Sequence, residues 1–140
     1  MEIASSSTSG AVWGHANVGG PIGLVQGNRT LKGSRASGNG PGVNEVGGLA
    51  GKVVGTITRC STSAGKITGS GVNTGGLVGS MSGSMTNSHS SAEVIAVDTA
   101  GGLAGELLDS TVSSCYTSGA VNASSHTVGG IVGWADNSSI

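Results

Sequence analysis

The sequence has very few large aromatic side chains: no phenylalanine, two tryptophans and one tyrosine among 140 residues. Such a composition does not suit a conventional layered core, because aromatic residues supply much of the buried area there. Stacked coils need only columns of small aliphatic side chains, so the shortage of aromatic residues favours a solenoid.

Charge and long apolar runs are also scarce. Six basic and seven acidic residues leave a formal net charge of −1, and the basic residues are scattered. Nucleic-acid binders usually carry a clustered basic footprint, so we expect no nucleic-acid partner. No apolar run approaches the roughly 18 residues that span a bilayer, which predicts no membrane insertion. Residues 1–5 lack the charged and apolar regions of a secretory signal. If the parent protein is exported, we expect its signal outside this segment or export by another route.

Glycine, serine and threonine are abundant and supply 63 of the 140 residues. Taken alone, this composition is typical of a flexible linker. A linker, however, has no reason to place apolar residues at fixed offsets. A box of the form Gly-Gly-x-x-Gly occurs at residues 19–23, 47–51, 75–79, 101–105 and 129–133. The boxes start 28, 28, 26 and 28 residues apart, and a period of this size indicates stacked repeats.

The repeat predicts an all-β fold, a parallel β-solenoid (β-helix) of about five coils with roughly 28 residues per coil. Short apolar runs bounded by Gly, Asn and Ser favour strands over helices. Three strand-like stretches per repeat would close one triangular coil, with successive coils about 4.8 Å apart. We expect one domain over residues 1–140 that begins and ends within a repeat. Its repeats lie near 19–46, 47–74, 75–100, 101–128 and, in part, 129–140.

Two aliphatic positions follow each box and are expected to pack inside the coils. These pairs are Val25 and Leu31, Val53 and Ile57, Met81 and Met85, and Leu107 and Val112. A third stretch, rich in Ser and Thr, leads to the next box, as at residues 60–67 and 115–121. The start of the chain joins in phase, because residues 8–12 match residues 117–121.

Within the boxes we predict structural roles for the glycines and for the residue after each glycine pair. Strand alternation predicts that this residue fills the lumen and that the following column, with Ala50, Val78 and Ala104, lies on the opposite face. On that face the small apolar column must either face solvent or press against something else. The glycines fit a bend and tight packing between coils, and the alternative is a lateral contact surface. The structural residues are Gly47, Gly48, Leu49, Gly51, Gly75, Gly76, Leu77, Gly79, Gly101, Gly102, Leu103, Gly105, Gly129, Gly130, Ile131 and Gly133.

The box Gly-Gly-Leu-(Ala/Val)-Gly, followed by an aliphatic pair and by Cys-Tyr-Thr-Ser-Gly-Ala-Val at residues 115–121, resembles the GLUG repeat. The resemblance covers nearly the whole chain and is clearest over residues 43–134. The first unit departs from it, with Pro21 at the Leu position and a basic stretch at residues 28–35. GLUG repeats occur in large bacterial surface and secreted proteins, including adhesin-like chains and the non-catalytic part of some immunoglobulin A-cleaving metallopeptidases. The resemblance implies a β-solenoid spacer or adhesive element at a bacterial surface and implies no catalytic residue.

No pattern of residues indicates a reactive site, so we expect no enzyme activity, no catalytic residue, no metal and no cofactor. His15, His89 and His126 occupy different repeat phases and have no ligands at metal-binding spacing. The boxes lack the Asp of a calcium-binding nonapeptide, and the Gly-Lys pairs lack the Ser or Thr of a phosphate loop. A carboxylate pair on one face, as in polysaccharide-cleaving solenoids, stays open as an alternative.

Cys60 and Cys115 fall at matching repeat positions, and Ser88 holds the matching position between them. In one column the two cysteines would be two coils apart, about 10 Å, which exceeds the roughly 7 Å limit for a disulfide. We therefore predict free, mostly buried thiols that act as small packing residues.

Asparagine and tryptophan offer two further hypotheses. Asn17, Asn44 and Asn73 shortly precede their boxes, where we expect turn conformations, with sugar recognition as the alternative. Trp13 and Trp134 lie near the two ends of the chain. We expect them to cover the end coils, with carbohydrate platforms as the alternative.

The leading hypothesis is a non-enzymatic structural or adhesive repeat segment of a bacterial surface or secreted protein, extracellular or at the cell surface. One alternative is a self-assembling fibre subunit that stacks end to end or side to side, because unpaired strand edges template further pairing. Another alternative is a glycan-binding or glycan-cleaving β-solenoid. The expected partners are a second copy, through the solenoid ends or the small apolar face, and a host glycan or protein.

Overall fold

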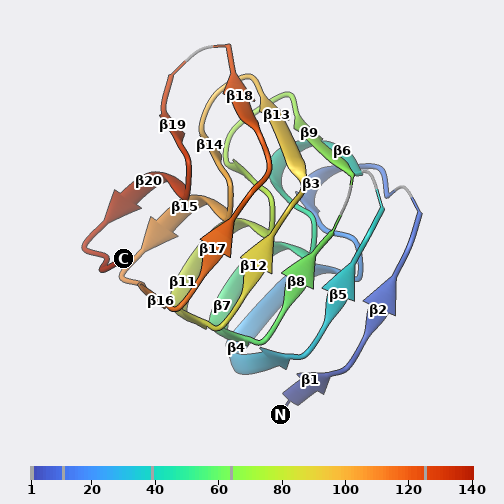
Figure 1. Cartoon of the computed structure of the whole chain (residues 1–140), viewed down its shortest axis with the longest axis vertical. Helices are drawn as coiled ribbons and strands as arrows, with labels where there is room; N and C mark the ends of the chain where they lie inside the picture. Colours follow the sequence, from blue (N-terminus) through green and yellow to red (C-terminus); the bar gives the residue numbers. More distant parts are fainter. Residues whose placement is uncertain (1, 11, 39, 64, 125) are drawn as a thin grey trace.

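The computed structural model describes residues 2–10, 12–38, 40–63, 65–124 and 126–140. It is a parallel β-solenoid of about five coils, as the repeat predicts, and the described residues form strands and no helix. None of these residues belongs to a helix that could cross a membrane. Each coil passes through three parallel sheets, here named A, B and C, and Figure 1 shows the coils stacked in chain order from blue to red.

Sheet A contains the strand that follows each glycine box. Its strands pair in parallel in the order β1, β4, β7, β11, β15 and β20, and β16 pairs with β11 beside β15. Their bounds are Glu2–Ala4 (β1), Ile22–Lys32 (β4), Ala50–Thr58 (β7), Val78–Thr86 (β11), Ala104–Leu108 (β15), Thr111–Ser113 (β16) and Val132–Asp136 (β20).

Sheet B contains one two-residue strand per coil, and Figure 1 shows these strands side by side. They are Ser7–Thr8 (β2), Arg35–Ala36 (β5), Ser61–Thr62 (β8), His89–Ser90 (β12) and Tyr116–Thr117 (β17). The strands β2 and β17 therefore share a phase, which confirms the match between residues 8–12 and 117–121 for the described residues. Ala11 and Ala64, which belong to the stretches compared above, lie outside the described residues.

Sheet C closes each coil and leads into the next box. Its strands pair in the order β18, β13, β9, β6, β10, β14 and β19, and β3 pairs with β6. Their bounds are Gly14–Val18 (β3), Gly40–Gly47 (β6), Lys66–Gly69 (β9), Thr74–Gly75 (β10), Glu93–Ala96 (β13), Ala100–Gly101 (β14), Val121–Ala123 (β18) and Val128–Gly129 (β19).

The predicted aliphatic positions form two continuous columns inside sheet A. One column contains Val25, Val53, Met81 and Leu107, and the other contains Leu31, Ile57, Met85 and Val112. Each of these side chains is at most 5% exposed. A fully buried aliphatic side chain is worth roughly 1.5–3 kcal/mol relative to an exposed one, so these columns supply much of the core stability.

The predicted alternation within the boxes is wrong. Leu49, Leu77 and Leu103 do stack inside the coils, and the N–H of each of the first two donates to the carbonyl of the next at 2.9 Å. The following residues, Ala50, Val78 and Ala104, are also fully buried, in the same core cluster. The leucines lie in the bend between sheets C and A, not within a strand. Because the chain turns between the two positions, both side chains point inward.

The first coil is less regular than the others. Between the paired positions Val25–Val53 and Arg29–Gly55, β4 contains two more residues than β7. Pro21 has no N–H to donate, but its neighbours still join the ladder: the Gly20 N–H donates to the Gly48 carbonyl at 3.0 Å, and Ile22 pairs with Ala50. The departure of this unit from the repeat therefore produces a bulge and leaves the stacking intact.

Candidate functional site

The five boxes lie together along one edge of the solenoid, where sheet C turns into sheet A. Gly47, Gly75, Gly101 and Gly129 end strands of sheet C and are in register with one another. The second residues of the sheet A strands β7, β11, β15 and β20 are Gly51, Gly79, Gly105 and Gly133. Gly48, Gly76, Gly102 and Gly130 form the bend between them, together with Leu49, Leu77, Leu103 and Ile131, and the Leu103 N–H donates to the Ile131 carbonyl at 2.8 Å.

Close approach of backbones is what requires glycine in the boxes. A Cβ on Gly47 would collide with the Ala50 carbonyl oxygen and would lie 2.6 Å from the Cα of Val78 in the next coil. A Cβ on Gly76 would collide with the Gly102 carbonyl oxygen and with the Ser90 hydroxyl oxygen of sheet B. The positive-φ glycines of the described chain all lie outside the boxes. The edge is therefore a packing element in which glycines such as Gly47 and Gly76 cannot be enlarged without moving backbone, whereas Gly130 in the last coil has open space beside it.

The two cysteines are free thiols, as predicted. Cys60 is buried and Cys115 is half-buried, and the Cys60 N–H donates to the hydroxyl of the intervening Ser88 at 3.1 Å. Burial raises the pKa of both thiols above the ordinary value, and hydrogen bonds to backbone groups only partly oppose this effect. Both side chains are therefore protonated at neutral pH and act as packing residues.

The structure gives two of the histidines partners that the sequence analysis missed. His126 Nδ1 lies 2.9 Å from Asp98 Oδ1, and the His89 ring stacks on Tyr116 with centroids 4.8 Å apart. The spacing in the sequence could have revealed both contacts, because residues one repeat apart stack in neighbouring coils. Asp98 and His126 are 28 residues apart, and His89 is in register with Tyr116. No cluster of three or more His, Cys, Asp or Glu side chains that could hold a metal forms among the described residues.

The asparagine hypothesis is confirmed in part. Asn17 and Asn73 have φ angles of 51° and 57°, which is the left-handed turn conformation that Asn tolerates. Asn44 does not adopt it, and the neighbouring Glu45 does, with φ of 51°. The Asn44 side-chain oxygen instead accepts the Val72 N–H at 3.0 Å, which links two coils.

The tryptophans do not cap the coils. Trp13 is 79% exposed and Trp134 is 53% exposed. Trp134 pairs with Glu106 on the outer side of sheet A, so its ring projects away from the lumen. The end-cap prediction is wrong, because a cap would bury most of the ring against the end coil.

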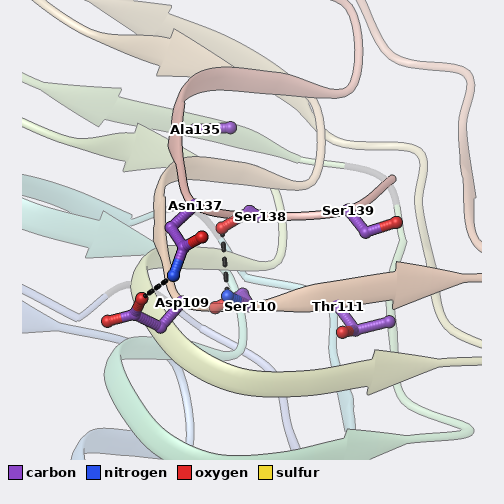
Figure 2. Close-up of a pocket in the computed structure, with 7 residues that line it drawn as sticks. All are labelled: Asp109, Ser110, Thr111, Ala135, Asn137, Ser138 and Ser139. Carbon is purple, nitrogen blue, oxygen red and sulfur yellow. Dashed lines mark hydrogen bonds between the residues drawn. The ribbon is translucent and has the colours of Figure 1, made fainter.

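A wide polar hollow of about 500 Å³ lies beside the last coils, and Figure 2 shows the residues that line it. Its polar groups bond to one another: Asn137 Nδ2 donates to Asp109 Oδ1, and the Ser110 N–H donates to the Ser138 hydroxyl at 3.0 Å. Asp109 is the one acidic residue among the seven that line it. This hollow therefore does not supply the carboxylate pair that glycoside hydrolysis requires.

A second hollow, of about 370 Å³, lies on sheet C and has an apolar lining. Ile95, Ala96 and Val97 form its centre, between residues 68–70 and 122–124 of the neighbouring coils. None of the residues that line this hollow is charged or aromatic. It offers shape and apolar contact, without a group that could perform chemistry.

The outer side of sheet A carries two adjacent columns of hydroxyl side chains, which the sequence analysis missed. One column contains Thr30, Thr56, Ser84, Thr111 and Ser139, and the other contains Thr58, Thr86 and Ser113. Towards the start of the chain the two ladders continue to charged residues, since Glu2 pairs with Thr30 and Lys32 pairs with Thr58. The signal in the sequence is a hydroxyl-x-hydroxyl triplet at residues 56–58, 84–86 and 111–113. We call these two columns the hydroxyl face.

No protein-family model, curated protein or solved structure matches this chain in the three comparisons made with it. The function proposed below therefore rests on the fold, the surface and the pattern of the repeat.

Proposed function

We propose that the chain is a non-enzymatic structural segment, a stiff β-solenoid rod that spaces or presents adhesive parts of a bacterial surface or secreted protein. The observation that supports this proposal is the continuity of the stack. Aliphatic columns and parallel backbone hydrogen bonds connect each coil to the next from sheet to sheet. Each coil is held mainly by its neighbours, which is how solenoid rods obtain their rigidity.

The resemblance to GLUG repeats supports the proposed location outside the cell or at its surface. The raised pKa of the buried Cys60 and of the half-buried Cys115 also suits an oxidising environment, because a protonated thiol reacts slowly with oxidants. An adhesive role would place a ligand on one of the outer faces.

Rigidity can be tested with spin labels on the exposed serine column of sheet B. This column contains the residue that directly follows each strand of sheet B: Ser9, Ser37, Ser63, Ser91 and Ser118. Its first and last members, Ser9 and Ser118, are four coil steps apart, which corresponds to about 19 Å. Cysteines at positions 9 and 118, with Cys60→Ala and Cys115→Ser to remove the native thiols, should give one narrow distance distribution near this value. A broad distribution in the absence of denaturant would contradict the rod.

Enzyme activity on glycans is the alternative that an activity screen decides. We expect no release of reducing sugar from a panel of bacterial and host polysaccharides. Reducing sugar that appears with the wild type and disappears with Asp109→Asn would contradict the non-enzymatic proposal and would identify the polar hollow as the site.

A second candidate function is self-association through the last coil. Ile131 is 40% exposed, whereas Leu103 in the same column is fully buried, and a Cβ on Gly130 would meet no atom within 4 Å. This apolar edge fits another coil of the same kind, such as one from a second copy. We expect the sedimentation coefficient of the wild type to rise with concentration and that of Ile131→Lys to stay constant. A monomeric wild type at millimolar concentration would exclude this function.

A further inference from the structure

The hydroxyl face is specific to its two columns and does not simply follow from the abundance of Ser and Thr. A nearby outward column of the same sheet contains Leu24, Lys52, Ser80, Glu106 and Trp134, so its chemistry changes in every coil. The column of Thr56 keeps a hydroxyl in every strand from β4 to β16. The residue type is therefore restricted to Ser and Thr in some outward columns of sheet A and varies from coil to coil in others.

Strand stability alone does not account for this pattern. Threonine is a good strand former because it is β-branched, and threonine pairs across strands stabilise sheets. Ser84 and Ser113 are not β-branched, yet they occupy the same columns as Thr56 and Thr86. What the members share is the hydroxyl group.

The parallel ladder arranges these hydroxyls as a regular lattice. Neighbouring coils repeat every ~4.8 Å, and alternate residues of one strand repeat every ~6.6 Å. The Thr86 hydroxyl donates to the Thr58 hydroxyl at 3.0 Å, which fixes both rotamers. Ile57, Met85 and Val112 alternate with the outward residues and are buried, so the core holds the strands beneath the face in place. The lattice is therefore rigid before any ligand arrives.

The chemistry of the face restricts what it can recognise. The six central residues, at 56, 58, 84, 86, 111 and 113, are all uncharged. The two columns contain no aromatic ring on which a sugar could stack. The charged residues of the two ladders, Glu2 and Lys32, lie beyond these six and form an ion pair of 4.0 Å with each other. The six central hydroxyls therefore form a neutral, periodic array, which is complementary to another neutral, periodic array of hydroxyls.

We propose that the hydroxyl face binds the surface of ice. Ice also presents ordered hydroxyl groups at a regular repeat, which is close to the repeat between neighbouring coils. Immobilising one water molecule costs up to about 2 kcal/mol of entropy. The hydroxyl face and the ice surface are both ordered before they meet, so their contact avoids most of this cost. Ordered water on the face merges with the crystal and stops its growth where the protein sits. This function goes beyond the rod and does not depend on it.

The test uses the complete 140-residue chain. The wild type is expected to concentrate in a slowly growing ice hemisphere and to inhibit ice recrystallisation. The double variant Ser84→Lys/Thr86→Lys places two large, strongly hydrated groups at the centre of the face and should lose ice enrichment, down to the level of an albumin control. The variant Thr86→Ser keeps the hydroxyl and should retain binding.

The matched control is Ser63→Lys/Ser118→Lys, which makes the same kind of change in the exposed serine column of sheet B and should leave ice binding intact. Circular dichroism checks that each variant keeps its strand content. Exclusion of the wild type from the ice would overturn the proposal. An equal loss of ice enrichment in the hydroxyl-face variant and in the control variant would overturn it too. Binding to crystalline cellulose without binding to ice would also overturn it, in favour of a polysaccharide ligand.

Discussion

Thr74 shows how a single buried hydroxyl interrupts the core. Its side chain is fully buried on sheet C, in register with Val46 and Ala100, and its hydroxyl has no hydrogen-bond partner among the described residues. A buried polar group without a partner costs about 1–3 kcal/mol. Thr74→Val should therefore raise the free energy of unfolding by about 1 kcal/mol, which denaturant titration measures.

Thr62 is the matched control for that prediction. It is also buried, but its hydroxyl lies 2.9 Å from the Gly76 carbonyl oxygen and 2.7 Å from the Ser90 hydroxyl. Thr62→Val should lower stability by about 1–2 kcal/mol, because it removes one hydrogen bond from each of these two buried groups. If both variants shift stability in the same direction, hydrogen bonding is not what distinguishes the two positions.

The buried thiols predict a pH dependence of stability. Burial raises the folded-state pKa of Cys60 above its ordinary value of 9.0, so the neutral thiol is favoured in the fold. The resulting stabilisation is fully present below the ordinary pKa and is lost as the pH rises through the higher, folded pKa. The melting temperature should fall across this alkaline range, and that of Cys60→Ala should fall less steeply. Parallel pH profiles for the two proteins would contradict this assignment.

At the scale of the strand and bend, the glycine edge predicts opposite effects at two equivalent positions. A Cβ on Gly76 would collide with the Gly102 carbonyl and the Ser90 hydroxyl, whereas a Cβ on Gly130 would meet no atom within 4 Å. Gly76→Ala should destabilise the fold by about 3 kcal/mol or more, because backbone must move. Gly130→Ala should be neutral or stabilising by up to about 1 kcal/mol, because it restricts the unfolded chain. Thermal melts of both variants check this, and similar losses would show that close backbone approach is not what distinguishes the two positions.

The strands themselves were predictable because their apolar positions recur every coil. The period alone places Val53 beneath Met81 and Ile57 beneath Met85, and the structure confirms both pairs. The inward position of Ala50 was not predictable from strand alternation. Alternation holds only within a strand, and the chain bends at Leu49 just before β7 begins.

The spacing of the boxes also conceals local differences in coil length. The first and second boxes are 28 residues apart, yet β4 contains two extra residues between Val25 and Arg29. The second coil has one extra residue between Thr62 and Ile67 and one between Gly69 and Thr74, relative to the first. Insertions in different sheets therefore cancel in the box spacing. Only register can reveal them, since Gly, Ser and Thr occur in every connection.

At the scale of the whole molecule, the stability of each coil depends on how many neighbouring coils it contacts. Stability in a solenoid is approximately the sum of the coils and of the interfaces between them, so a coil with one neighbour is less stable than a coil with two. We expect amide hydrogens of β7 and β11 to exchange most slowly and those of β1 and β20 to exchange fastest. Uniform protection along the chain would mean that the solenoid unfolds as one cooperative unit.

The same neighbour effect predicts unequal costs for truncating one column. Leu77 is fully buried between Leu49 and Leu103, whereas Ile131 has its partner on one side only and is 40% exposed. Leu77→Ala should cost about 2–5 kcal/mol, because it leaves a cavity between two coils. Ile131→Ala should cost less than about 1.5 kcal/mol, because much of its surface already contacts water. Urea titrations compare the two values. Equal costs would mean that the last coil is covered in solution, and they would support self-association through Ile131 over an isolated rod.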